Sequence, residues 1–181
     1  MFKKICVSFA IAALLGLNVG GAADADEVGP PLGPNDLTWA QYDALLAVPD
    51  SSSYSVSSRT RAAMSCTAVV TPVYFRTSGS GYDFGSVGVK PETNCSVNMY
   101  KITNTTTMYK TVWWGFQALG TWTNMNTGTN KLTTKTIEIV CADTRSTEFV
   151  AVFTSEGVFP NGTSSGTVVS SSGRLGCGTN P

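Results

Sequence analysis

Short runs in which apolar residues and threonines alternate with polar residues fill the chain from about residue 62 to residue 177. This period of two is typical of half-buried strands. The predicted strands are Ser65–Thr71, Val73–Thr77, Tyr82–Val89, Cys95–Thr103, Met108–Leu119, Lys135–Cys141, Glu148–Thr154 and Gly166–Ser171. Turn-forming clusters predict breaks at Ser78–Gly81, Lys90–Asn94, Asn104–Thr107, Asn124–Asn130, Ala142–Thr147 and Pro160–Gly162. Because no helical pattern separates these strands, we expect an all-β antiparallel sandwich, Ig-like (immunoglobulin-like) or of the jelly-roll type, with a small barrel as the alternative.

The same alternation assigns side chains to the core. The predicted inward faces are Met108, Val112, Trp114, Phe116 and Ala118 on one strand, Ile137, Ile139 and Cys141 on a second, and Phe149, Ala151 and Phe153 on a third.

One short helix is predicted ahead of the strands. Thr38 and Gln41 have the spacing of a capping box, in which each side chain bonds to the other residue's backbone amide. Leu37 and Tyr42 fit a hydrophobic staple, and Pro49 ends the helix. A helix of about 10 residues is marginal alone, so it must dock on the domain or form only part of the time.

The outward face of the predicted strand Met108–Leu119 carries Tyr109 and Trp113, and Trp122 follows nearby in the sequence. Aromatic residues four positions apart on one face lie roughly 13 Å apart at ~3.3 Å per residue. That spacing suits contact with two separated sugar rings. We therefore predict Tyr109, Trp113 and Trp122 as a flat ligand-binding strip. The alternative is that a loop or the 37–48 helix covers it.

The first 25 residues have the three-part pattern of a secretory signal peptide. Lys3 and Lys4 form a basic start, an apolar run extends from Ile5 to about Val19, and Ala23-x-Ala25 is the expected cleavage motif. The run is shorter than the ~20 residues that a membrane span needs, so no transmembrane anchor is expected after cleavage. The predicted organisation is a signal peptide over residues 1–25, a helix and an aperiodic serine-rich linker over 26–61, and a β-sandwich domain over 62–181.

Removal of the signal peptide leaves four of the five cysteines: Cys66, Cys95, Cys141 and Cys177. An even count in an exported chain predicts two disulfides, for which three pairings are possible. We favour Cys66–Cys95 with Cys141–Cys177, because each loop then closes within one half of the domain. The cysteines lack Cys-x-x-Cys spacing, so no metal site is expected.

The composition of the chain excludes several catalytic mechanisms and makes some classes of partner unexpected. The chain has no histidine, which excludes Ser/His/Asp and Cys/His catalysis, and its 12 basic and 12 acidic side chains make nucleic acid an unexpected partner. It has no dinucleotide-binding or Walker motif, and we assign no cofactor and no catalytic residue. Glu138 with Glu148 could still form the carboxylate pair of a small glycan-degrading enzyme, which we keep as an alternative.

Arg59 and Arg61 follow the serine-rich stretch directly. Basic residues in an exposed linker are common sites of proteolytic processing. Residues 26–61 could therefore be a removable pro-segment, and the plain alternative is a solvated linker.

With the four cysteines placed, the region from Cys66 to Cys177 resembles the small secreted four-cysteine β proteins of high-GC Gram-positive bacteria. The matching segments are the strand opened by Cys66, Cys95–Ile102, Ile137–Cys141 and Phe159–Gly162 with the serine-rich strand that follows. The resemblance implies export and a disulfide-stapled β fold, and it supplies no active site.

These observations together predict a secreted, non-catalytic binding or interaction protein of the cell envelope or extracellular space. The expected partner is a glycan or a cell-surface protein. A small carbohydrate-active enzyme, and a secreted effector or inhibitor matured by cleavage near Arg61, are the alternatives.

Overall fold

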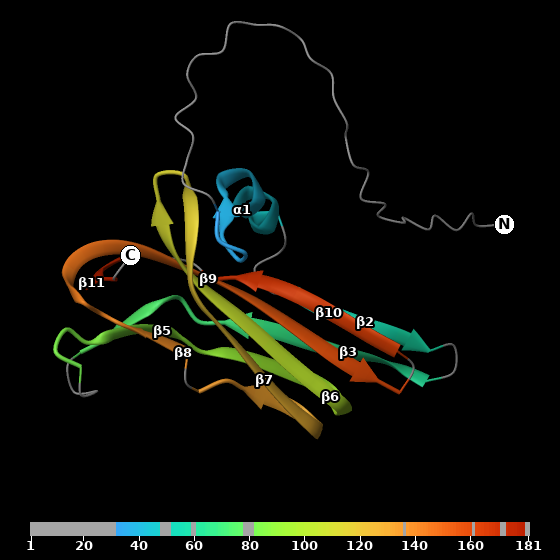
Figure 1. Cartoon of the computed structure of the whole chain (residues 1–181). Helices are drawn as coiled ribbons and strands as arrows, with labels where there is room; N and C mark the ends of the chain where they lie inside the picture. The colour runs from blue at the N-terminus through green and yellow to red at the C-terminus, as the bar shows by residue number, and fades with distance from the viewer. Residues whose placement is uncertain are drawn as a thin grey trace, which may run out of the picture.

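The computed structural model describes residues 32–47, 52–58, 61–77, 82–135, 137–160, 162–170 and 173–179. Most of this chain is antiparallel sheet, which confirms the predicted all-β, sandwich-like architecture with one short helix (Figure 1). The elements are β1 (Leu37–Thr38), α1 (Trp39–Leu46), β2 (Ser52–Ser58), β3 (Arg61–Val70), β4 (Tyr74–Arg76), β5 (Ser86–Val89), β6 (Pro91–Val112), β7 (Gly115–Thr133), β8 (Ile137–Val140), β9 (Asp143–Phe159), β10 (Gly162–Val169) and β11 (Arg174–Gly178).

The long β6–β7 hairpin connects the layers of the sandwich. One edge of β6 pairs with β7, and the other pairs first with β3 through residues 91–95 and then with β9 through residues 101–110. β2 extends the sheet beyond β3, whereas β10 and β11 pair with β9. β10 lies against β2 and β3 (Figure 1). β4, β5 and β8 form a separate three-stranded sheet.

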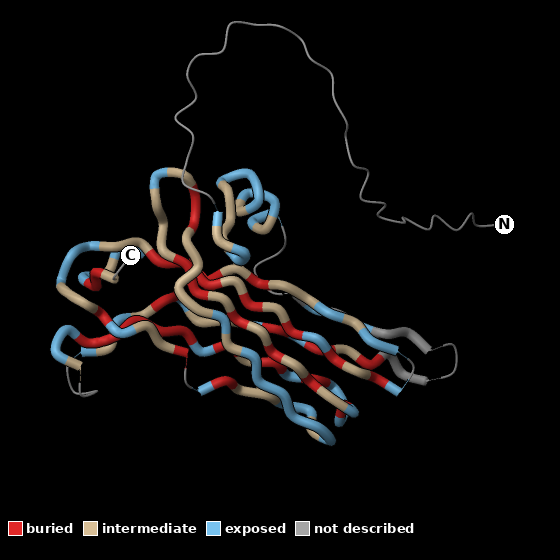
Figure 2. The backbone as a smooth tube through the Cα atoms, in the orientation of Figure 1, coloured by how far each residue is buried: buried red, intermediate tan, exposed pale blue. Residues whose placement is uncertain are grey.

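Much of the core consists of alternate strand residues (Figure 2), whereas β5 and residues 149–151 are buried at consecutive positions. Phe149, Ala151 and Phe153 are fully buried, as their alternation predicts. One buried cluster surrounds Phe153 and the Cys66–Cys95 disulfide, and a second surrounds Phe149 and the Cys141–Cys177 disulfide. Each disulfide therefore lies inside an apolar cluster.

Both disulfides have the predicted pairing. Cys66 lies directly opposite Cys95 in the β3–β6 ladder, whereas Cys177 attaches β11 to the residue that follows β8. Two disulfides indicate an oxidising environment. The helix in the described part of the chain is too short to cross a membrane. The predicted signal peptide lies outside the described residues.

The predicted single strand Met108–Leu119 is wrong, because the chain turns at Trp113 and Trp114. These residues connect β6 to β7, so the two halves of the predicted strand lie side by side, with Thr111 opposite Phe116. Gly115 leaves the turn at a φ of +151°, and a Cβ there would collide with the carbonyl oxygen of Leu37. The turn therefore requires glycine at this position.

Four predicted breaks lie wholly or mostly inside strands. They are Lys90–Asn94, Asn104–Thr107, Asn124–Asn130 and Ala142–Thr147. Threonine favours strands, and here Thr107 and Thr121 face each other across β6 and β7 with their hydroxyls 2.9 Å apart. The polar clusters that predicted turns thus form cross-strand pairs.

The serine-rich stretch expected to be a linker contains strand β2. Its backbone pairs in register with β3, with Ser53 opposite Thr67 and Tyr54 opposite Cys66. Backbone hydrogen bonds to an existing strand define β2, so the sequence needs no hydrophobic alternation to form it.

The helix α1 has the predicted capping box. The amide of Thr38 donates to Gln41 Oε1 at 2.8 Å, and the amide of Gln41 donates to Thr38 Oγ1 at 3.3 Å. Leu37 and Tyr42 both pack against the buried cluster of Tyr109, Phe116 and Val150. The helix thus docks on the β6–β7 hairpin.

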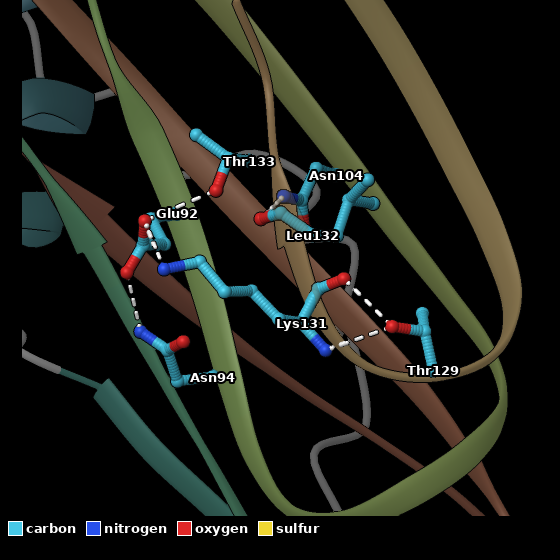
Figure 3. A network of polar contacts seen from close by, with 7 residues as sticks. All are labelled: Glu92, Asn94, Asn104, Thr129, Lys131, Leu132 and Thr133. Carbon is cyan, nitrogen blue, oxygen red and sulfur yellow. Dashed lines mark hydrogen bonds and ion pairs between the residues drawn. The ribbon is translucent and has the colours of Figure 1, made fainter.

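A polar network connects β6 and β7 around Glu92 (Figure 3). The Glu92 carboxylate accepts hydrogen bonds from Asn94 at 2.6 Å and Thr133 at 3.0 Å, and it lies 2.9 Å from Lys131 Nζ. The Asn94 hydrogen bond is the largest cause that lowers the pKa of Glu92 from its ordinary 4.5, and the bond to Lys131 is the next.

Because this pKa is lowered in the folded state, Glu92 contributes stability above pH 4.5 and loses it as the pH falls through the folded-state value. We expect Glu92→Gln to lower the free energy of unfolding by at most about 1 kcal/mol at neutral pH, since the pair is partly exposed. Urea unfolding at neutral and acidic pH would measure the difference, with exposed Glu156→Gln as the control. A loss of equal size at both pH values would contradict this assignment.

Candidate functional site

The structure does not form the predicted flat strip of Tyr109, Trp113 and Trp122. Tyr109 is 6% exposed and packs with Phe116 and Val150, while Trp122 is half-buried against the cluster around Phe149. Trp113 is 61% exposed. The turn at Trp113 is the physical reason, because the strip required a straight strand through this residue.

Trp113 instead forms an exposed pair with Trp39 of α1. The indole Nε1 of Trp39 donates a hydrogen bond to the backbone oxygen of Trp113 at 3.3 Å, and Trp39 is 45% exposed. The Trp39 ring packs edge-on against Phe116, with centroids 4.7 Å apart, and Tyr42 covers the same ring at 4.1 Å. We call Trp39 and Trp113 the tryptophan pair.

The two residues immediately before Trp113 in the sequence, Thr111 and Val112, line a pocket of about 400 Å³. The end of β6, the start of β9 and strand β11 form this hairpin pocket. Its lining residues are Lys110, Thr111, Val112, Arg145, Ser146, Thr147, Glu148, Arg174, Gly178 and Thr179.

The hairpin pocket is polar and contains three basic side chains. Arg145 forms an ion pair with Asp143 at 2.7 Å, and the backbone hydrogen bond from Arg145 is the main cause that lowers the pKa of Asp143. Burial is the main cause that lowers the pKa of Lys110, and the positive charge of Arg145 adds to it. Arg174 forms no ion pair within the described part of the chain. The pocket thus carries excess positive charge.

Two hydroxyl groups add unused hydrogen-bonding capacity to this pocket. The side-chain oxygens of Thr111 and Thr179 are buried and have no hydrogen-bond partner in the structure. Buried hydroxyls normally have partners, so a ligand or solvent molecule in the pocket would satisfy them. The arrangement can therefore bind a polar ligand that has both donor and acceptor groups.

The structure does not bring Glu138 and Glu148 together in one pocket. Glu138 lies on β8, where its carboxylate accepts hydrogen bonds from Arg76 at 2.9 Å, Tyr82 at 3.2 Å and Ser86 at 3.3 Å. Glu148 lines the hairpin pocket, and Asp143 on the same strand is five residues away, roughly 16 Å at ~3.3 Å per residue. This separation is larger than the about 5 to 9.5 Å between the two catalytic carboxylates of a glycosidase.

Within the residues that the structure describes, no group of three or more cysteine, aspartate or glutamate side chains is placed to hold a metal ion. No protein-family model, curated protein or solved structure matches the chain. The geometry of the tryptophan pair and the hairpin pocket is therefore the basis for assigning a function.

Trp113 was the residue that the sequence identified correctly as exposed, although for the wrong reason. Sequence reasoning missed the site roles of Trp39, Lys110, Arg145 and Arg174. Trp39 lies on the predicted helix, and its hydrogen bond to Trp113 crosses 74 residues of sequence, so no local pattern connects the two. The basic residues come from three strands and share no motif.

Proposed function

We propose that this chain is an exported, non-catalytic binding protein that recognises glycans through the tryptophan pair and the adjoining hairpin pocket. The two disulfides agree with a role in an oxidising compartment, and the predicted signal peptide provides the export route. The observation that carries the proposal is that the Trp113 side chain is 61% exposed and directly follows, in the sequence, two residues that line a polar pocket.

A sugar ring matches both parts of this surface. Its C–H faces pack on exposed indole rings, and its hydroxyls can bond to the charged and hydroxyl groups of the hairpin pocket. The Trp39 ring and the Trp113 backbone are held in place, since the Trp39 indole is bonded to the Trp113 backbone and packed on Phe116. Groups that are already fixed lose little conformational freedom on binding.

We expect Trp113→Ala to weaken glycan binding about 30-fold, because truncating a tryptophan at the centre of an interface costs about 2 kcal/mol or more. Pull-down on insoluble polysaccharides and on intact bacterial cells would identify the ligand, and calorimetry would give the affinity. Tyr100→Ala is the matched control, since Tyr100 is an aromatic residue of β6 with 65% exposure.

Equal losses in the Trp113 and Tyr100 variants would contradict the proposed surface. Binding to cells that disappears after protease treatment would replace the glycan with a cell-surface protein as partner. The carboxylate-pair enzyme has no supporting contact in the described residues.

A further inference from the structure

A second pocket, of about 410 Å³, shares no lining residue with the hairpin pocket. Arg76, Lys90, Thr133, Thr134 and Lys135 line it. Three of these described lining residues are basic and none is acidic, so we call it the cationic pocket.

The backbone around the cationic pocket is fixed by hydrogen bonds between neighbouring segments. The amide of Thr134 donates to the carbonyl oxygen of Pro91 at 3.0 Å, and the amide of Thr71 donates to that of Lys90 at 3.3 Å. Lys90 joins β5 to β6, and Lys135 lies between β7 and β8. The basic side chains therefore extend from anchored positions.

Arg76 is held at the pocket by polar contacts across the three-stranded sheet. Its guanidinium donates to Glu138 Oε2 at 2.9 Å and to the Tyr74 hydroxyl at 2.8 Å. Gly88 lies between Tyr74 and Glu138 in the ladder, and a Cβ there would collide with the carbonyl oxygen of Ile137. Arg76 and Lys90 also lie 5.4 and 5.6 Å from the centre of the Tyr74 ring.

The carboxylates near this pocket are already engaged. Glu138 accepts from Arg76, and Glu92, which lines an adjoining pocket with Lys90, is bonded to Asn94, Thr133 and Lys131 (Figure 3). Lys90 and Lys135 form no ion pair with any described residue. Three cations against the single carboxylate of Glu138 leave two positive charges for a ligand.

Thr134 provides an independent indication that this pocket accepts a ligand. The residue is 4% exposed, it lines the cationic pocket, and its hydroxyl has no hydrogen-bond partner. Buried hydroxyls are rarely left unpaired, because the loss of hydrogen bonds to water is then uncompensated. An acceptor atom inside the pocket would supply the missing partner.

We propose that the cationic pocket binds a tetrahedral oxyanion, a phosphate or sulfate group, either free or carried by an extracellular polymer. A phosphate group with a charge near −2 matches the two excess positive charges, and its oxygens can accept from Arg76, Lys90, Lys135 and Thr134. The pocket is larger than the anion alone and has room for an attached sugar or glycerol unit. This site is independent of the proposed glycan surface.

Calorimetric titration of the disulfide-bonded protein with inorganic phosphate and with sulfate tests the proposal. We expect about millimolar affinity, weakened at least tenfold by the double variant Lys90→Gln/Lys135→Gln. Lys101→Gln, on β6 outside both pockets, should bind as the unmodified protein does. Absence of binding, or equal binding by the double variant, would overturn the site.

Thr134→Val keeps the shape of the side chain and removes its hydroxyl. We expect this variant to bind phosphate several-fold more weakly and to melt at a higher temperature without phosphate, because the unpaired buried group is gone. A variant with unchanged phosphate affinity would refute the role of Thr134. Phosphate binding by the Trp113→Ala variant should be normal, which separates this test from that of the glycan surface.

The source of the anion is resolved by comparing free phosphate with a glycerol-phosphate polymer and free sulfate with a sulfated polysaccharide. Tighter binding of a polymer at equal concentration of anionic groups, lost in the double variant, identifies a substituent on a chain. Equal binding per group identifies the free anion.

Discussion

Replacement of both Cys141 and Cys177 by alanine is expected to lower the free energy of unfolding by about 4 kcal/mol. The disulfide closes a loop with a sequence separation of 36 residues, and the chain-entropy cost of leaving such a loop open is roughly this size. A domain of this length has a total stability of about 5 to 15 kcal/mol, so a large share would be lost. Urea unfolding of the variant and the unmodified protein measures the difference.

Cys66→Ala/Cys95→Ala is the matched control for this prediction. Its loop has a separation of 29 residues, so the global loss should be similar, at roughly 3.5 kcal/mol. The local effects should differ, because Cys66 and Cys95 belong to the long strands β3 and β6, of 10 and 22 residues, whereas Cys177 anchors the five-residue strand β11. Amide exchange in residues 174–178 should rise only when Cys141 and Cys177 are replaced.

β11 supplies Arg174 and Gly178 to the hairpin pocket. The Cys141→Ala/Cys177→Ala variant should therefore also lose glycan affinity under conditions where it is still folded. Unchanged exchange in β11 would show that pairing with β9 alone holds this wall of the pocket.

The sequence predicted those features of the fold that depend on nearby residues or on strong burial. The capping box needs only Thr38 and Gln41, and the alternation of Phe149, Ala151 and Phe153 directly reflects their full burial. The disulfide pairing followed from loop closure within each half of the chain. These signals are local or strongly periodic, and the structure confirms each of them.

Features that depend on a distant partner were not predictable in this way. Asn104 resembles a turn residue, yet it is 1% exposed, with its amide bonded to the Leu132 carbonyl oxygen and its Oδ1 2.8 Å from Thr93 Oγ1. A polar residue can occupy a buried strand when such partners exist, and the sequence does not reveal them. For the same reason β2 was missed, since its pairing with β3 supplies the hydrogen bonds that the serines do not indicate.

Removal of residues 1–61 is expected to abolish cooperative folding of the remaining chain. The segment contributes β1, which pairs with β7, α1, which covers Phe116, and β2, which pairs with β3. Uncovering Phe116, which is 2% exposed, would cost stability on the scale of a large core truncation, about 3 to 5 kcal/mol, before the loss of β2 is added. Near-ultraviolet circular dichroism and urea unfolding of a chain beginning at Ala62 would measure the effect.

Cleavage after Arg61 without removal of the segment is the informative control. If residues 37–58 are part of the fold, the cleaved fragment should stay bound and the tryptophan pair should still bind its ligand, because β1, α1 and β2 keep their contacts. A chain beginning at Ala62 that unfolds cooperatively at an unchanged urea midpoint would instead identify the segment as a dispensable pro-segment. Since Trp39 belongs to the removed part, such a protein would also lose half of the tryptophan pair, and its glycan affinity would show whether Trp113 suffices.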